Sequence, residues 1–188
     1  ITMNQTHSNN VKFISRNSLN KNKISCDAIL TNKKEICISV LTADCVPILI
    51  YDPVNNIIAA IHAGWKGAYK GIIQNTIKKL IKNGSKKKNL IVAIGPSISQ
   101  KNYEVSLSFY KKFIKKNKIN KIFFKIRKSI FFNLRKYVEY QFKSSQVKNI
   151  SHINLDTFDQ KNNFFSRRRS LFNNQKDYGR NISIIMIK

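Results

Sequence analysis

Two apolar runs of strand length, 46–51 and 57–62, are separated by a polar segment, 52–56, that contains Asp, Pro and two Asn residues. Apolar runs of this length joined by a short polar turn predict a β-hairpin. Cys45 precedes the first run and His62 ends the second, so strand pairing would bring the thiol and the imidazole together. From this spacing alone, a ligand site and a buried structural Cys–His pair are both open interpretations.

A histidine far upstream supplies a third donor. His7 lies in the segment Gln5-Thr6-His7 and, with Cys45 and His62, it makes a set of two imidazoles and one thiol. Such a set suits a catalytic zinc that keeps one coordination position open. Gly67 and Gly71 bracket the start of a predicted helix, whose N-terminal N–H groups would attract an anion. We therefore expect a metal or thiol site beside an anion site.

The rest of the chain mixes helical and strand patterns. Apolar residues at helical spacing make 71–83 the clearest helix, and Gly84 is placed to end it. Further helices are expected at 105–116 and 129–142, and strands at 24–31, 36–42, 90–94, 150–155 and 182–187. Because the elements do not alternate strictly as βαβ units, we expect an α+β fold with a mixed β-sheet core flanked by helices.

Length and composition favour one cytoplasmic domain. The 188 residues suffice for a single domain, 1–188, and 42% of them are hydrophobic, as in ordinary globular proteins. No apolar run approaches the roughly 18 residues that would indicate a membrane-spanning helix. The segment Ile1–Gln5 lacks the pattern of a signal peptide, and an odd count of 3 cysteines argues against a disulfide framework. The sequence therefore predicts a reducing compartment and no membrane partner.

The chain is strongly basic, with 35 Lys and Arg residues against 9 Asp and Glu, a formal net charge of +26. Such a field attracts polyanions. The basic residues nevertheless occur with Asn and Ile in every segment, as a bias toward A/T-rich codons would produce. A nucleic-acid footprint should gather on one face. We therefore favour compositional bias, and a basic nucleic-acid-binding module without catalysis is an alternative.

Several separated motifs resemble one known family. The segments Thr42–Leu49 and His62–Gly67, which read TADCVPIL and HAGWKG, are similar to the paired motifs of the laccase-domain, or YfiH-like, family. Supporting similarities, in the family's order, are Gln5-Thr6-His7, Asp27–Thr31, Gly95–Ile98 with Tyr103–Val105, and Phe164–Arg169 with Gly179-Arg180. The resemblance covers most of the chain and implies a single domain of the YfiH-like type.

The resemblance implies a zinc-dependent purine nucleoside phosphorylase. Such an enzyme cleaves adenosine, inosine, guanosine or methylthioadenosine with phosphate, and in this family it also deaminates adenosine. By position, His7, Cys45 and His62 would be the zinc ligands, and Cys45, His62 and Asp44 would be the catalytic residues. Cys45 would bind as a thiolate. Purine nucleoside and phosphate would be the partners, while the preferred nucleoside and the oligomeric state stay open.

The same resemblance points to further substrate-binding residues. Arg168, Arg169 and Arg180 match family positions, and guanidinium groups fit phosphate bidentately. Lys66 stands where the family has Arg, so the positive charge is kept and the bidentate guanidinium group is lost. Asp44 would orient a ligand or shuttle a proton, or else cap the local turn.

Other positions depart from the family pattern. Arg167 replaces a Tyr before the paired arginines, Asn133 replaces an Asp, and Asp156 stands where a Cys is frequent. Relatives usually carry further strands before the segment that contains His7, so we expect this chain to lack those N-terminal strands.

A copper-dependent polyphenol oxidase, the family's older label, is the main alternative. Two His and one Cys can form a blue-copper centre with a weak axial Met. Met3 and Met186 are the only methionines, and neither lies in a Cys–His–Met loop. A multicopper enzyme would also need many more than the 3 histidines present. Zinc is therefore favoured over copper.

Overall fold

The computed structural model describes residues 1–14 and 24–188. Within them, six strands form a mixed sheet in the order β12-β8-β6-β7-β4-β2. The β4, β7, β6 and β8 strands pair antiparallel, while β2 and β12 add in parallel at the two edges. The strands are β2 (Val11–Phe13), β4 (Ala28–Thr31), β6 (Val46–Asp52), β7 (Ile57–Ala63), β8 (Ile91–Ile94) and β12 (Asn149–His152).

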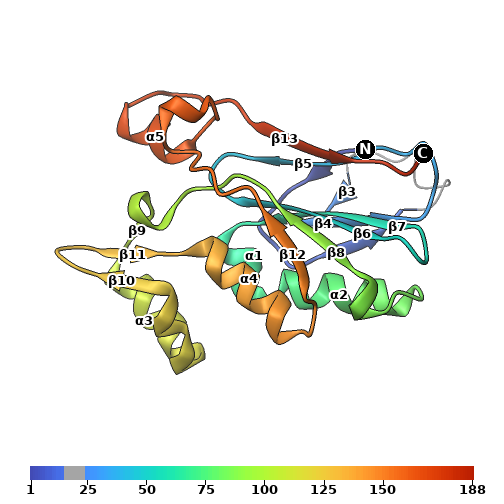
Figure 1. Ribbon diagram of the computed structural model, residues 1–188. Coiled ribbons are helices and arrows are strands. Elements are labelled where there is room, and N and C mark those ends of the chain that lie inside the picture. The colour runs from blue at the N-terminus through green and yellow to red at the C-terminus, as the bar shows by residue number, and fades with distance from the viewer. Residues whose placement is uncertain (15–23) are drawn as a thin grey trace.

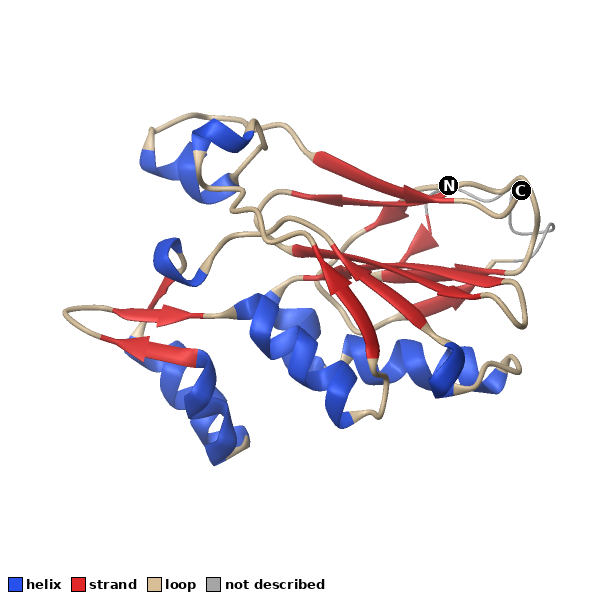
Figure 2. Ribbon diagram, in the orientation of Figure 1, coloured by secondary structure: helices blue, strands red, loops and turns tan. Residues whose placement is uncertain are grey.

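A helical layer covers one face of this sheet and a layer of strands covers the other (Figures 1 and 2). The helices are α1 (Trp65–Lys70), α2 (Ile72–Lys82) and α4 (Leu134–Ser144). On the opposite face, β5 (Ile38–Thr42) pairs with β13 (Asn181–Ile185), and β1 (Met3–Asn4) pairs with β3 (Ile24–Ser25).

Smaller elements extend from this core at one end of the sheet (Figure 1). One group contains β9 (Glu104–Val105), α3 (Leu107–Lys116), β10 (Phe124–Ile126) and β11 (Ile130–Phe132). Short 3₁₀ turns occur at η2 (Lys87–Asn89), η3 (Gln100–Asn102), η4 (Lys118–Phe123) and η5 (Gln160–Asn162). A last helix, α5 (Arg167–Phe172), lies near the end of β13 that is farther from the chain termini.

The two covering layers explain why β7 is apolar along its whole length. Its odd-numbered residues, such as Ile57 and Ile61, belong to the core beneath the helices. Its even-numbered residues Ile58 and Ala60 belong to a second core beneath β5 and β1. Successive strand residues point to opposite faces, so a strand covered on both sides needs apolar residues at nearly every position. His62 has the same parity as Ile58 and Ala60, which directs it toward the β1–β5 side.

The structure confirms the expected α+β arrangement, the hairpin and the helix that ends before Gly84. Two expectations about local structure were wrong. The predicted helix 129–142 begins instead at Leu134, because Ile130–Phe132 pairs with β9 and β10 and buries Phe132. Asn133 then accepts a hydrogen bond from the Lys136 N–H and caps α4. The predicted strand 24–31 is interrupted at Asp27, whose carboxylate binds the segment that carries His7.

In the part of the chain that the structure describes, no helix combines the length and the apolar character needed to cross a membrane.

Candidate metal centre

Three side chains from distant parts of the sequence meet at one end of the hairpin. His7, Cys45 and His62 each offer a ligand atom, and these atoms all lie within 4.8 Å of one another. The His7 Nε2 atom is 3.8 Å from the Cys45 Sγ atom. The two imidazole rings have centroids 4.7 Å apart and are nearly perpendicular, at 80°. Pairing of the hairpin therefore brings Cys45 and His62 together as expected, and the N-terminal segment adds His7 to them.

The backbone positions each of these side chains. In the β6–β7 ladder Val46 pairs with Ala63, which places Cys45 across from Gly64. An added Cβ at Gly64 would lie 2.7 Å from the His7 Cδ2 atom and 3.0 Å from the Cys45 Sγ atom. Glycine at this position therefore leaves the space that the two ligand side chains occupy. His7 itself has a left-handed backbone, with φ 57°.

Asp27 connects the segment of His7 to the ring of His62. Its buried carboxylate accepts hydrogen bonds from the N–H groups of Thr6, His7 and Ser8 at 3.2, 3.0 and 2.6 Å. The His62 Nδ1 atom lies 2.8 Å from Asp27 Oδ1. Since an ionised carboxylate only accepts, Nδ1 carries the proton and Nε2 is left as the ligand atom. Asp27 thereby fixes both histidines.

The electrostatics of the cluster favour a thiolate. Burial would raise the pKa of Cys45, but hydrogen bonding and charge interaction with His62, and then with His7, lower that pKa to about 6. Burial would lower the pKa of His62, but Asp27 and then Cys45 raise it to about 9. At neutral pH, with no metal bound, the pair is therefore a thiolate and an imidazolium. Metal binding would release the proton of His62, because a coordinating imidazole must be neutral.

The donor set fits a divalent transition metal. One thiolate and two imidazoles are the ligands that such ions take from proteins, and three protein ligands leave a further position for water or substrate. Gly64 leaves space for two of the ligand side chains, and the Asp27 carboxylate holds the ring of His62, as the residues around a metal-binding site do. These residues can therefore hold a metal ion.

The cluster opens onto a cavity of about 460 Å³. Three cationic side chains line this cavity, from Lys66 on α1 and from Arg167 and Arg168 on α5. The aromatic residues Trp65 and Tyr103 also line it. The cavity thus combines metal ligands, positive charge and flat apolar surface, which suits an anionic group beside an aromatic one.

Comparison with known proteins identifies the family. A family model described as multi-copper polyphenol oxidoreductase laccase matches residues 1–188. This chain belongs to that family. A purine nucleoside phosphorylase of Rickettsia conorii is 41% identical over 166 residues, which cover 86% of this chain and 68% of that protein. A second, of Rickettsia prowazekii, is 38% identical over 192 residues, which cover 100% and 78%.

Solved structures share the fold of this laccase-domain protein. The crystal structure of the Bacillus licheniformis hypothetical protein YfiH superposes with a TM-score of 0.89 at 25% identity, covering 100% of this chain and 74% of that chain. Neisseria meningitidis protein NMB0706 superposes with a TM-score of 0.84 at 27% identity, with the same two coverages.

Each oxygen of the Asp44 carboxylate accepts a hydrogen bond. Oδ1 accepts from the Thr157 hydroxyl at 2.7 Å, and Oδ2 accepts from the Arg168 N–H at 2.6 Å. The carboxylate therefore sits at the N-terminus of α5, where negative charge is stabilised. Through its hydrogen bond from the Arg168 N–H, Asp44 connects the start of the hairpin, next to Cys45, to the helix that carries Arg167 and Arg168.

The arginines expected from the sequence have different positions. Arg168 lines the metal cavity, whereas Arg169 and Arg180 are not among its lining residues. Arg169 donates to the carbonyl groups of Thr157, Phe158 and Phe164 and holds the loop before α5. Arg180 stacks on the ring of Tyr178, with 3.7 Å between the guanidinium carbon and the ring centroid.

The sequence analysis gave no role in the site to Asp27, Arg167 or Tyr103. Asp27 had a detectable signal, because a lone acidic residue lies inside a run that is otherwise typical of a buried strand. Arg167 was noticed only as a departure from the family pattern. Tyr103 was noticed only as part of a family motif, and its place at the cavity depends on tertiary packing, in which the Arg168 guanidinium lies 5.3 Å from the centroid of its ring.

Proposed function

We propose that this laccase-domain protein is a zinc-dependent purine nucleoside phosphorylase. The observation that carries the proposal is a cluster of two imidazoles and one thiolate that opens onto a cavity lined by three cationic side chains. Relatives named purine nucleoside phosphorylase, at 41% and 38% identity, support the same activity.

His7, Cys45 and His62 would hold the zinc, because nitrogen and thiolate sulfur are its usual tetrahedral ligands. The bound ion supplies Lewis-acid polarisation of a substrate oxygen or nitrogen. Asp27 keeps the His62 ring in one orientation and makes it a more basic ligand. A thiolate ligand must stay reduced, so we propose that the enzyme works in the cytoplasm.

Phosphorolysis needs a phosphate held beside the sugar. A phosphate oxygen bonds to the ribose C1′ atom while the bond from C1′ to the purine nitrogen breaks, and its electron pair leaves with the purine. Lys66, Arg167 and Arg168 would neutralise the phosphate. Both terminal nitrogens of Arg168 donate to the Glu104 carbonyl at 3.0 Å, so this charge is already fixed. A fixed charge stabilises a developing one without reorganisation.

Two aromatic residues of the cavity would bind the purine base. Trp65 and Tyr103 line the same cavity as the three cations, and aromatic faces stack well on planar bases. Burial raises the pKa of Tyr103, so its hydroxyl stays protonated and can donate a hydrogen bond. We propose adenosine, inosine, guanosine and methylthioadenosine as substrates. We also propose a secondary deamination, in which water adds to the adenosine carbon that bears the amino group and ammonia leaves.

Copper chemistry is the weaker alternative. Met3 packs in the second core and Met186 is 46% exposed, and neither lines the metal cavity. The third histidine of the chain, His152, lies 4.0 Å from the Glu139 carboxylate and lines a different cavity. The residues at the cluster therefore supply one metal position and no axial sulfur of methionine.

The test combines metal analysis with turnover. Purified protein is analysed for bound metal and assayed with the four nucleosides, with and without phosphate, for free base and for ammonia. We expect bound zinc, phosphate-dependent release of base, and loss of both in Cys45→Ala and His62→Ala. Cys37→Ala and His152→Ala are matched controls, because each removes the same kind of side chain outside the cluster. Full turnover in either cluster variant would refute the assignment.

A further inference from the structure

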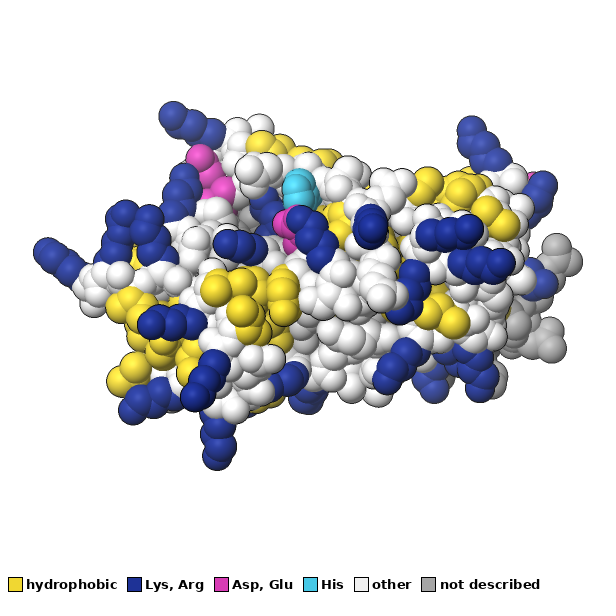
Figure 3. Space-filling view, turned by 60° about the horizontal axis from the view of Figure 1, so that its bottom comes forward, with side chains coloured by type: hydrophobic (Ala, Val, Ile, Leu, Met, Phe, Trp, Pro, Cys, Tyr) yellow, Lys and Arg dark blue, Asp and Glu magenta, His cyan; other side chains and the backbone are white. Residues whose placement is uncertain are grey.

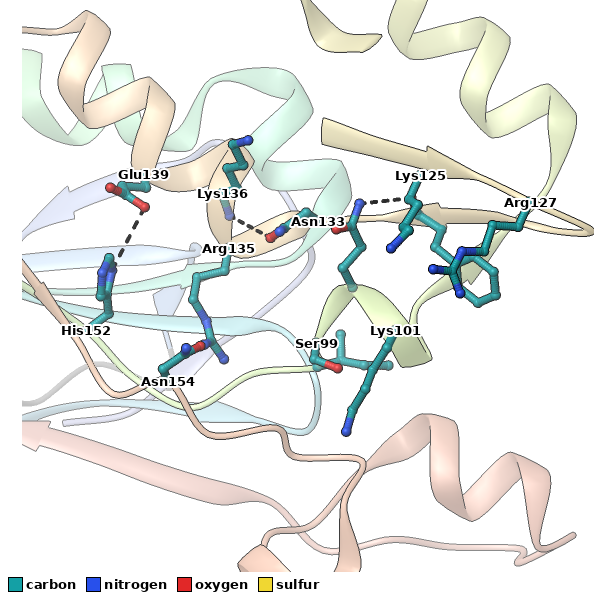
Figure 4. A pocket seen from close by; sticks show the side chains of 13 residues that line it. Ser99, Lys101, Lys125, Arg127, Asn133, Arg135, Lys136, Glu139, His152 and Asn154 are labelled. Carbon is teal, nitrogen blue, oxygen red and sulfur yellow. Dashed lines mark hydrogen bonds and ion pairs between the residues drawn. The ribbon is translucent and has the colours of Figure 1, made fainter. Parts of the chain in front are cut away.

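A second cavity, of about 630 Å³, lies on the other side of Ile98 from the metal cavity. Ile98 lines both cavities, whereas His7 and Cys45 line only the first. The second cavity is formed by the η3 turn, the β10–β11 hairpin, the start of α4 and the end of β12 (Figure 4). Its volume is in the range that holds a small-molecule ligand.

Cationic side chains are concentrated around this second cavity. They are Lys101, Lys125, Arg127, Arg135 and Lys136, which come from three separate elements (Figure 4). Five of the 13 lining residues are therefore basic, against 35 Lys and Arg among all 188 residues, which is about twice the share. On the face that Figure 3 shows, further basic side chains are scattered among polar and apolar areas, as composition alone would produce.

Carboxylates balance this charge only in part, because Asp156 interacts through its charge with Arg135 alone among the five cations. Glu139 is the acidic residue among those that line the cavity, and it already lies 2.5 Å from Lys143 and 4.0 Å from His152. None of the five cations forms an ion pair within the described ranges, 1–14 and 24–188. Like charges that share a concave surface repel each other and raise the local concentration of anions.

The five cationic side chains differ in how firmly hydrogen bonds hold them. Arg135 is fixed, because it donates to the carbonyl groups of Ser97 and Leu155 and to the Asn154 side chain. The other four side chains are exposed and make no hydrogen bond to another described residue. One anchored guanidinium, with exposed cations around it that no hydrogen bond holds, can contact several phosphate groups at once.

An aromatic surface lies beside the charges. Phe131 lines the cavity, and its ring does not take part in the aromatic contacts recorded elsewhere among the described residues. Phe131 is partly exposed, and an aromatic ring at a cavity wall is a surface on which a planar base can stack. We propose that this second cavity binds an anion with a chain of two or more phosphates, as in a nucleoside di- or triphosphate. The site does not use the metal cluster, so it stands independently of the proposed enzymatic activity.

Calorimetric titration of the full chain with ATP, and separately with inorganic tripolyphosphate, tests the proposal at about 150 mM salt, where long-range attraction is screened. The cavity variant is Lys125→Gln with Arg127→Gln, which removes two charges and no hydrogen bond of either side chain. The matched control is Lys78→Gln with Lys82→Gln, which removes two exposed charges from α2. We expect one anion per chain, bound about tenfold more weakly by the cavity variant and within about twofold of native by the control.

The two probes separate the sources of the phosphate chain. Tighter binding of ATP than of tripolyphosphate, lost in Phe131→Leu, would identify a nucleotide, whereas equal binding would identify the phosphate chain alone. Equal weakening in the cavity and control variants would overturn the proposal, because it would show attraction by net charge. The proposal would also be overturned if neither ATP nor tripolyphosphate bound stoichiometrically. It would be overturned as well if the protein bound only a single-stranded RNA oligomer and the cavity and control variants weakened that binding equally.

Discussion

Replacing Asp27 by Asn should separate the folding role of this carboxylate from its effect on the metal ligands. Oδ1 of Asp27 accepts from the His62 ring and from the His7 N–H. Oδ2 accepts from the N–H and the hydroxyl of Ser8 at 2.6 and 2.7 Å. An Asn side chain keeps only one acceptor oxygen, so in either orientation its NH₂ group meets at least two donors.

The size of the effect follows from these contacts. Hydrogen bonds to a charged group contribute about 1.5–3 kcal/mol each, so losing two should lower the free energy of unfolding by about 3–6 kcal/mol. The His62 ring also loses the partner that orients it and raises its basicity, and the backbone of His7 loses an anchor. Loss of a hydrogen-bond partner that orients a metal ligand typically weakens metal affinity by about 10–100-fold. Urea unfolding and competition with a chromophoric chelator measure the two quantities.

A matched control distinguishes a local effect from general destabilisation. Asp52 is also a buried carboxylate, and it accepts from Val54 and Asn55 in the β6–β7 turn, away from the metal ligands. Asp52→Asn should lower the stability and leave the metal affinity within about twofold of native, because distant sites act independently. If Asp27→Asn binds metal as tightly as the native protein, the orienting role assigned to Asp27 is wrong.

Two further predictions concern the packing of the site and the response to acid. Gly64→Ala should weaken metal binding by about tenfold or more, because the new Cβ would lie 2.7 Å from a carbon of the His7 ring; unchanged affinity in the chelator assay would contradict this geometry. The pKa values of Asp52 and Asp156 are lowered from their usual 3.8 by hydrogen bonds that outweigh burial, so the stability from these groups is present above pH 3.8 and is lost as the pH falls below it. The midpoint of urea unfolding should therefore fall between pH 6 and pH 3, and the fall should be smaller in Asp156→Asn.

The sequence was sufficient for features that depend on neighbouring residues. The hairpin follows from two apolar runs and a turn, and the helix 72–82 follows from apolar residues at helical spacing. The motifs around Cys45 and His62 placed two donors on paired strands, and His7 was found by its motif alone. Strand and helix periodicity are local properties, so these features could be predicted without knowing the rest of the fold.

Contacts between distant segments were decided only by the tertiary structure. Arg168 and Arg169 are adjacent in the sequence, yet one lines the metal cavity and the other holds three carbonyl groups, because α5 turns successive side chains to different surroundings. Asp27 bonds to a ring 35 residues away, and no local pattern specifies that partner. The strand at 130–132 displaced an expected helix because β9 and β10 supplied its hydrogen bonds. The sequence by itself determined which chemical groups this chain carries and the local shape of each segment, while packing between segments determined which of those groups face one another.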